Sequence, residues 1–329
     1  MARVLYVYSR RNTFTRIDLE ALRARFEVEE YFQDGARPRL RELVAKLRRC
    51  DVVFGWFASW HTLAALTLAR MLRKPSVLVI GGFDTASVPE IGYGNQQDPV
   101  RRRRARLAMS RATRLVTNSE YSRGEVERNI GIPPERVAVV HHGLADRFGE
   151  VDPGGKDPGL ALTVGVVDRL NLERKGMLPF VRAAAALPEV EFVVAGKWNG
   201  DAVEALRAEA GANVRLTGYL EDEELDALFR AAAVYVQASR HEGFGLSLAE
   251  AMLAGCVPVV TDVTALPEIV GDTGVRIAAP TADEVAAGVR RARELGAAEG
   301  ARARARVLER FPLAKRADGI CAEVEAALR

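Results

Sequence analysis

The chain has 329 residues, 48% of them hydrophobic and 28% charged, with a formal net charge of +3. This length suits two domains, and the composition is that of an ordinary soluble protein. No run of eighteen apolar residues occurs, so the sequence predicts no membrane-spanning helix. The start, MARVLYVYSRR, predicts a strand rather than a signal peptide. We therefore expect a cytoplasmic protein.

The three cysteines agree with that compartment. Cys50, Cys256 and Cys321 lie far apart in the chain and lack the spacing of metal ligands. Reduced thiols buried in the core are the expected state in the cytosol.

Basic residues are concentrated in the first 150 residues, whereas the remainder is net acidic. A basic half predicts attraction to anionic lipid headgroups at the inner face of the membrane, or to an acidic acceptor. The alternative is a solvated surface, because only six of the 47 basic residues are lysine and arginine is enriched along the whole chain. The run at residues 101–106 lacks interleaved aromatic residues, so nucleic-acid binding is the least favoured interpretation, and we predict none.

The first half predicts alternating strands and helices. Apolar and β-branched runs predict strands at residues 4–8, 52–56, 77–80, 115–117 and 137–140. Helical patterns occupy residues 17–26, 39–49, 61–72 and 101–111. A long glycine-containing loop, residues 81–98, is expected to face a ligand. This alternation predicts a doubly wound, Rossmann-like parallel sheet over residues 1–152.

A second alternation follows the turn-forming segment DPGGKDP at residues 152–158, the predicted linker. Strands are predicted at residues 160–164, 191–195, 214–216, 234–237, 257–261 and 275–277. Helices are predicted at residues 178–186, 203–209, 223–232, 246–254 and 282–295. The sequence therefore predicts a second Rossmann-like domain over residues 158–311.

The stretch at residues 234–270 carries the strongest functional signal. Its strand–loop–helix–strand pattern places the loop at the carboxyl end of a parallel sheet, where ligands bind in open α/β sheets. Glu242 in the loop and Glu250 on the helix are eight positions apart, about 12 Å at helical rise, which suits two ends of a nucleotide sugar. Alternatively, Ser247 and Glu250 form an S-x-x-E capping box that needs no ligand.

The segment from Glu242 to Glu250, EGFGLSLAE, resembles the E-x7-E signature of retaining glycosyltransferases of family 4 (glycosyl transferases group 1). The resemblance is strongest over residues 160–278. It implies a GT-B fold, in which two Rossmann-like domains face each other across a cleft. It also implies that the terminal helix, residues 312–329, returns to the first domain.

The resemblance assigns roles to residues of the second half. It implies that Glu242 orients the donor sugar catalytically and that Glu250 holds the ribose. Lys175 and Arg169 would bind the diphosphate, with Arg174 as the rival arginine. The remaining donor contacts would come from the turn after the first strand and from the start of the helix that carries Glu250: Gly165, Gly243, Phe244, Gly245, Leu246 and Ser247.

The first half departs from the family pattern. Residues 9–13 lack the Gly-Gly loop of many members, and Asp84 stands where members often carry a histidine near the reacting carbon. Asp84 is predicted to accept a hydrogen bond from donor or acceptor, or alternatively to serve only a turn. Aromatic residues at 56–61 would stack on an acceptor or belong to the core.

The resemblance thus implies transfer of a sugar, with retention of configuration, from a nucleotide diphosphate sugar to an unidentified hydroxyl acceptor. No metal-binding motif occurs in the sequence, so we expect neither metal nor cofactor to be required. A nucleotide-sugar epimerase of GT-B fold and a donor-binding subunit without activity of its own remain alternatives.

Overall fold

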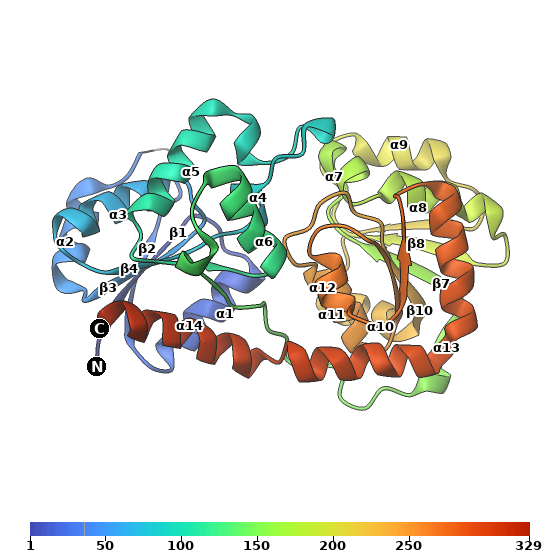
Figure 1. Cartoon of the computed structure of the whole chain (residues 1–329). Helices are drawn as coiled ribbons and strands as arrows, with labels where there is room; N and C mark the ends of the chain where they lie inside the picture. The colour runs from blue at the N-terminus through green and yellow to red at the C-terminus, as the bar shows by residue number, and fades with distance from the viewer. Residues whose placement is uncertain (36) are drawn as a thin grey trace. The chain divides into compact units, whose positions relative to one another are not determined.

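The structure, a computed structural model, describes residues 1–35 and 37–329. Its packing divides the chain into two units. The first contains residues 1–143 and 313–329, and the second contains residues 144–312. Each unit is described separately below (Figure 1).

The first unit is built on a six-stranded parallel sheet with the strand order β2-β1-β3-β4-β5-β6. Its strands are β1 (Arg3–Tyr8), β2 (Glu27–Phe32), β3 (Val52–Trp56), β4 (Ser76–Val79), β5 (Arg114–Thr117) and β6 (Val137–Val139). The chain order reverses at β1, which pairs with β2 on one side and β3 on the other. The carboxyl ends of β1 and β3 therefore flank the position where such sheets bind ligands.

Helices cover both faces of this sheet, as Figure 1 shows. One face packs against α1 and the terminal helix α14, and the other against α2, α3 and α5. The helices are α1 (Thr13–Arg23), α2 (Leu40–Arg49), α3 (Trp60–Met71), α4 (Gly82–Thr85), α5 (Pro99–Arg111), α6 (Glu120–Glu125) and α14 (Leu313–Leu328). The short helical turns are η1 (Pro89–Ile91), η2 (Asn95–Gln97), η3 (Val126–Ile130) and η4 (Pro134–Arg136).

Three details of the first unit differ from the predictions. The edge strand β2 was not predicted, because its sequence EVEEYF is mostly charged and lacks a central strand's apolar run. Helix α1 begins at Thr13 rather than near residue 17, because the Asn12 side chain accepts the backbone N–H of Thr15 and caps it. The predicted loop at residues 81–98 contains α4 and two 3₁₀ turns.

The second unit contains another six-stranded parallel sheet, with the order β12-β11-β10-β7-β8-β9. Its strands are β7 (Asp157–Val164), β8 (Glu191–Ala195), β9 (Val214–Gly218), β10 (Ala232–Gln237), β11 (Val257–Thr261) and β12 (Val275–Ile277). Here the chain order reverses between β7 and β10, which are paired neighbours. All six predicted strands are present, with β11 and β12 at the predicted bounds.

Two apolar clusters pack on the two faces of this sheet. The helices are α7 (Arg169–Arg174), α8 (Met177–Ala183), α9 (Ala202–Glu209), α10 (Asp222–Ala231), α11 (Leu246–Leu253), α12 (Leu266–Val270) and α13 (Ala282–Arg310), with turns η5 (Pro153–Gly155) and η6 (Ala184–Ala186). Helix α13 is interrupted by Gly296, which has a φ of 64°. Because of this kink, its first half packs in one cluster through Val289, and its second half in the other through Val307.

The division of the chain lies earlier than the predicted linker. Leu144 and Phe148 belong to the second unit's core, and β7 already begins at Asp157. Residues 144–152 therefore pack with the second unit, although the turn-forming composition of residues 152–158 suggested a boundary there. Helix α14 packs with the first unit.

In the described part of the chain, no helix is long and apolar enough to cross a membrane. The three cysteines are buried and form no disulfide with one another. Burial raises the pKa of Cys50 to about 11, which keeps this thiol protonated at neutral pH.

Candidate donor and acceptor sites

The order of the strands brings the principal predicted residues of the second unit together. Gly165 follows the end of β7, and Glu242 lies in the loop after β10. Because β7 and β10 are neighbours at the reversal of the strand order, these loops meet at the carboxyl edge of the sheet. Lys175 reaches this edge from the turn between α7 and α8.

Glu242 is the centre of a polar cluster at this edge. Its side chain is only 12% exposed, and a buried carboxylate is stable only when it is paired and hydrogen-bonded. Oxygen Oε1 accepts four donors, namely Gln237 Nε2 at 3.0 Å, Ser239 Oγ at 3.3 Å, Arg174 Nη1 at 3.2 Å and Lys175 Nζ at 3.3 Å. Two cations and two neutral donors thus fix one oxygen of this carboxylate.

These cations keep Glu242 ionised. Burial by itself would raise the pKa of Glu242, but Lys175 and Arg174 lower it to about 2. Burial lowers the pKa of Lys175, and the Glu242 carboxylate opposes that effect. The cluster therefore carries one negative and two positive charges, so it retains a net positive charge for an anionic ligand.

Gly165 leaves room for the side chain of Lys175. A Cβ at this position would lie 2.7 Å from Lys175 Cδ and 3.0 Å from Met177 Cε, both within flexible side chains. We expect Gly165→Ala to displace Lys175 while the fold persists, lowering kcat/KM by about tenfold through misplacement of the cation. Turnover of the purified variant, compared with its thermal unfolding, checks this. Unchanged kcat/KM in a folded variant would contradict a positioning role for Gly165.

The start of α11 lies beside this cluster. Gly245 precedes the helix with a φ of 99°, and among the described residues no side chain caps it, so the backbone N–H groups of Leu246 and Ser247 remain suited to an anion. Gly243 is partly exposed in the preceding turn. Phe244 differs from the predicted donor contact, because its ring is buried and packs edge-on against Phe311, with centroids 5.4 Å apart.

Glu250 does not form the alternative capping box. Helix α11 starts at Leu246, which places Ser247 inside the first turn rather than at the cap. The carboxylate of Glu250 instead accepts Arg147 Nη1 at 3.0 Å, and Arg147 also contacts Asp226 at 2.7 Å. Burial raises the pKa of Glu250, and Arg147 opposes this shift. The sequence gave no signal for this partner, which lies 103 positions away.

The structure also decides between the two arginines. Arg169 points to solvent, with 80% of its side chain exposed, and pairs with Asp201 at 2.5 Å. Arg174 is 12% exposed and contacts Glu242. The preference for Arg169 was therefore wrong in placing it at the Glu242 cluster, which contains its rival Arg174. Helix α7 turns Arg174 toward the sheet, whereas Arg169 begins that helix.

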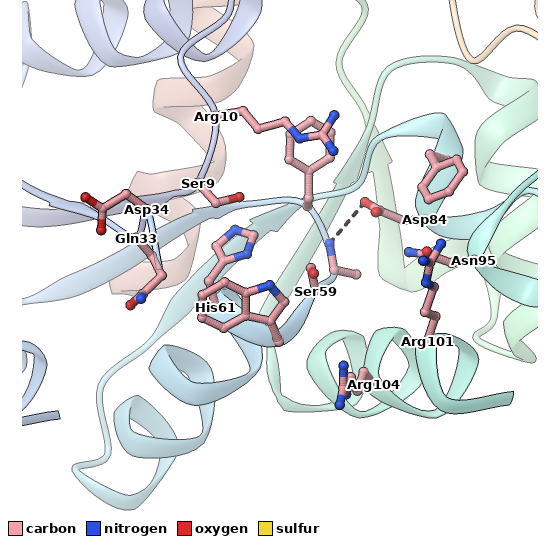
Figure 2. Close-up of a pocket in the computed structure, with 14 residues that line it drawn as sticks. Ser9, Arg10, Gln33, Asp34, Ser59, His61, Asp84, Asn95, Arg101 and Arg104 are labelled. Carbon is pink, nitrogen blue, oxygen red and sulfur yellow. Dashed lines mark hydrogen bonds between the residues drawn. The ribbon is translucent and has the colours of Figure 1, made fainter. Parts of the chain in front are cut away.

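The first unit contains a cavity of about 620 Å³ at the carboxyl ends of its central strands. Figure 2 shows Arg10, from the loop after β1, on one side and Arg101 and Arg104, from α5, on another. Trp60 also lines the cavity, whereas Trp56 is 1% exposed in the core. The aromatic segment is thus divided between the two predicted alternatives.

Asp84 lies on the cavity wall and is 2% exposed. Its Oδ2 accepts the backbone N–H groups of Gly81 at 2.9 Å and Ala58 at 3.0 Å, the latter drawn in Figure 2. Burial raises the pKa of Asp84 to about 7, although these two hydrogen bonds lower it. The carboxyl group therefore supports the turn, and its predicted contact with donor or acceptor remains a prediction.

His61 contributes a buried acceptor to the same cavity. Its Nε2 lies 2.9 Å from the Trp56 carbonyl oxygen, which can only accept, so Nε2 carries the proton and Nδ1 does not. In the described part of the chain Nδ1 has no hydrogen-bond partner. Burial lowers the pKa of His61 to about 4, so the ring is neutral at neutral pH.

This shift predicts an acid-dependent loss of stability. Between pH 6.5 and 4 the unfolded chain binds a proton at His61 that the folded chain does not, so the free energy of unfolding falls as pH falls, by about 3 kcal/mol in total. We expect the difference between the native protein and His61→Gln to change by that amount in urea titrations from pH 7 to 4. Asp84 acts in the opposite direction over this range but is common to both proteins. A pH-independent difference would contradict the prediction.

Over residues 1–35 and 37–329, no three His, Cys, Asp or Glu side chains are placed to hold a metal ion. Metal independence remains a prediction.

Comparison with known proteins matches both halves of the chain. Residues 161–294 match the family model described as glycosyl transferases group 1, and residues 10–147 match that of glycosyltransferase family 4. The chain belongs to the family 4, group 1 glycosyltransferases.

Individual relatives place the family 4 chain among transferases. It is 30% identical over 187 residues to O-antigen chain mannosyltransferase B of Escherichia coli, covering 51% of the chain and 48% of the relative. It is 31% identical over 245 residues to D-inositol 3-phosphate glycosyltransferase of Mycolicibacterium gilvum, covering 66% and 50%. The chain thus spans about half the length of these curated relatives.

The fold of this family 4 member is GT-B, as the sequence resemblance implied. HepE of Anabaena, solved in complex with UDP and glucose, superposes with a TM-score of 0.78 at 18% identity. The match covers 99% of this chain and 100% of HepE.

Proposed function

We propose that this chain transfers a hexose from a nucleotide diphosphate sugar to a hydroxyl acceptor, with retention of configuration and without a metal ion. The observation that carries the proposal is the Glu242 cluster, where Arg174 and Lys175 meet a carboxylate at the carboxyl edge of a Rossmann-like sheet. The group 1 match includes these residues, and HepE of the same fold binds UDP and glucose.

The geometry divides the donor between four groups. Lys175 and Arg174 supply cations for the diphosphate, on which charge develops as the leaving group departs. One oxygen of Glu242 is fixed by its donors, and the other is available to a sugar hydroxyl. Glu250 is placed on α11 to accept the ribose hydroxyls while it shares Arg147.

The proposed step needs no side-chain base. The bond between the anomeric carbon and the phosphate oxygen breaks, and a bond to the acceptor oxygen forms on the same face of the sugar. The acceptor's proton passes to the departing phosphate oxygen. Neutralising that phosphate too early would slow this transfer, so two cations beside one carboxylate give a balanced site.

A panel of UDP-, GDP- and ADP-sugars without added metal tests the proposal. We expect one nucleotide class to raise the melting temperature of the purified protein, because a ligand that binds only the folded state stabilises it. Glu250→Ala should lose most of that shift. Absence of any shift would overturn donor binding.

Turnover assays then decide the activity. Release of the nucleotide together with a glycosylated product supports transfer. Consumption of the donor without a glycosylated product would indicate epimerisation instead, and binding without turnover across many acceptors would indicate a donor-binding subunit.

A further inference from the structure

The cavity of the first unit has a basic lining. Arg10, Arg101 and Arg104 line it from two sides, and in the described part of the chain no carboxylate lies within ion-pair distance of their guanidinium groups. The nearby Asp98 is used otherwise, since it caps α5 by accepting the N–H groups of Val100 and Arg101, both at 2.8 Å. The three cations are therefore available to a ligand.

The two carboxylates on the cavity wall do not cancel this charge. Asp84 is directed to the backbone N–H groups of Gly81 and Ala58. Asp34 is exposed and lies 3.9 Å from Arg39, outside the cavity lining. The cavity thus presents more positive than negative charge.

Helix geometry separates this lining from a general basic surface. Arg101 and Arg104 are three positions apart and share one side of α5. Arg102 and Arg103, in the same run, line a different depression together with Gln96. The chain therefore offers two arginine pairs of equal charge on one helix, of which only one lines the cavity.

The rest of the lining suits hydroxyl groups. His61 Nδ1 is a buried acceptor without a partner in the described residues, and Asn95 and Ser59 add neutral polar atoms. Trp60 provides an aromatic surface of the kind that packs on a sugar ring. A polyhydroxy compound with an anionic group matches both parts of the cavity.

We propose that this cavity binds the acceptor and that the acceptor is a phosphorylated polyhydroxy compound, its phosphate held by Arg10, Arg101 and Arg104. Three guanidinium groups from two elements suit the several oxygens of a phosphate, whereas a planar carboxylate is satisfied by one arginine fork. The role as acceptor site rests on the proposed function, but the anion site itself does not. The phosphate could belong to a soluble sugar phosphate or to a phospholipid headgroup.

The test uses the full chain without nucleotide and measures binding of glucose 6-phosphate and glucose by calorimetry. We expect glucose 6-phosphate to bind at least about tenfold more tightly than glucose. Arg101→Gln/Arg104→Gln should weaken that binding by about ten- to thirtyfold, because two charge-assisted donors are lost. Arg102→Gln/Arg103→Gln, the charge-matched control, should change it by less than about twofold.

Vesicles of phosphatidylcholine with phosphatidylglycerol distinguish the two sources. Vesicle binding that falls more in Arg101→Gln/Arg104→Gln than in the control, and that competes with glucose 6-phosphate, assigns the site to a headgroup. Binding of glucose 6-phosphate alone assigns it to a soluble phosphate. Equal losses in the two double variants would overturn the proposal by showing a general surface-charge effect, as would equal affinity for glucose or no binding of either probe.

The donor panel keeps the two proposals separable. Nucleotide-sugar binding without selective binding of glucose 6-phosphate would overturn the cavity proposal and leave the transferase proposal standing. The reverse pattern would overturn donor binding and leave the anion site standing.

Discussion

Replacing Lys175 by alanine is expected to lower kcat/KM for sugar transfer by about two to three powers of ten. Lys175 Nζ lies 3.3 Å from Glu242, with its side chain 15% exposed, so its charge acts where water screens it little. Because the charge on the diphosphate grows as the donor bond breaks, most of the loss should appear in kcat rather than in KM. Steady-state kinetics on the donor identified by the panel measures this.

Three arginine variants serve as comparisons. Arg174→Ala should cause a similarly large loss, since Arg174 shares Oε1 of Glu242 with Lys175. Arg169→Ala should have a small effect, because that side chain is exposed and paired with Asp201. Arg182→Ala, an exposed residue paired with Glu209, is the general control. Near-normal turnover of Lys175→Ala would remove the phosphate role from this cluster.

The fold was largely predictable because both units repeat one strong pattern. Buried parallel strands appear in the sequence as short apolar runs, and β11, for example, was predicted at its observed bounds. The failures lie where burial is partial. Strand β2 is a charged edge strand, and the turn-forming segment at residues 152–158 lies within the second unit rather than between the units.

The site was predictable only where neighbours in sequence are also neighbours in space. Strand order explains why Gly165, Lys175 and Glu242 meet, and the family signature located them. Long-range partners gave no local signal: Arg147 reaches Glu250 across 103 positions. The choice between Arg169 and Arg174 depended on which side of a six-residue helix faces the sheet, which spacing alone did not settle.

The second large effect is expected for stability, at Arg316. This residue of α14 is 1% exposed and forms a bidentate pair with Asp18 of α1, with Nε–Oδ1 and Nη2–Oδ2 distances of 2.8 and 2.7 Å. Asp18 also accepts Trp56 Nε1 at 3.0 Å. Arg316→Met should lower the free energy of unfolding by about 3–5 kcal/mol, because it leaves a buried carboxylate without its cation. Urea denaturation at neutral pH measures the change.

Two further variants identify the cause of that loss. Arg25→Ala removes the pair with Asp318, which also joins α14 to the segment after α1 but is largely exposed, and should cost less than about 1 kcal/mol. Arg316→Leu/Asp18→Leu should recover part of the loss, since no unpaired charge then remains and only the polar contacts of Trp56 and the Val140 carbonyl are lost. A double variant as unstable as the sum of the two single variants would show that α14 is held by packing rather than by this ion pair, because independent contributions add and coupled ones do not.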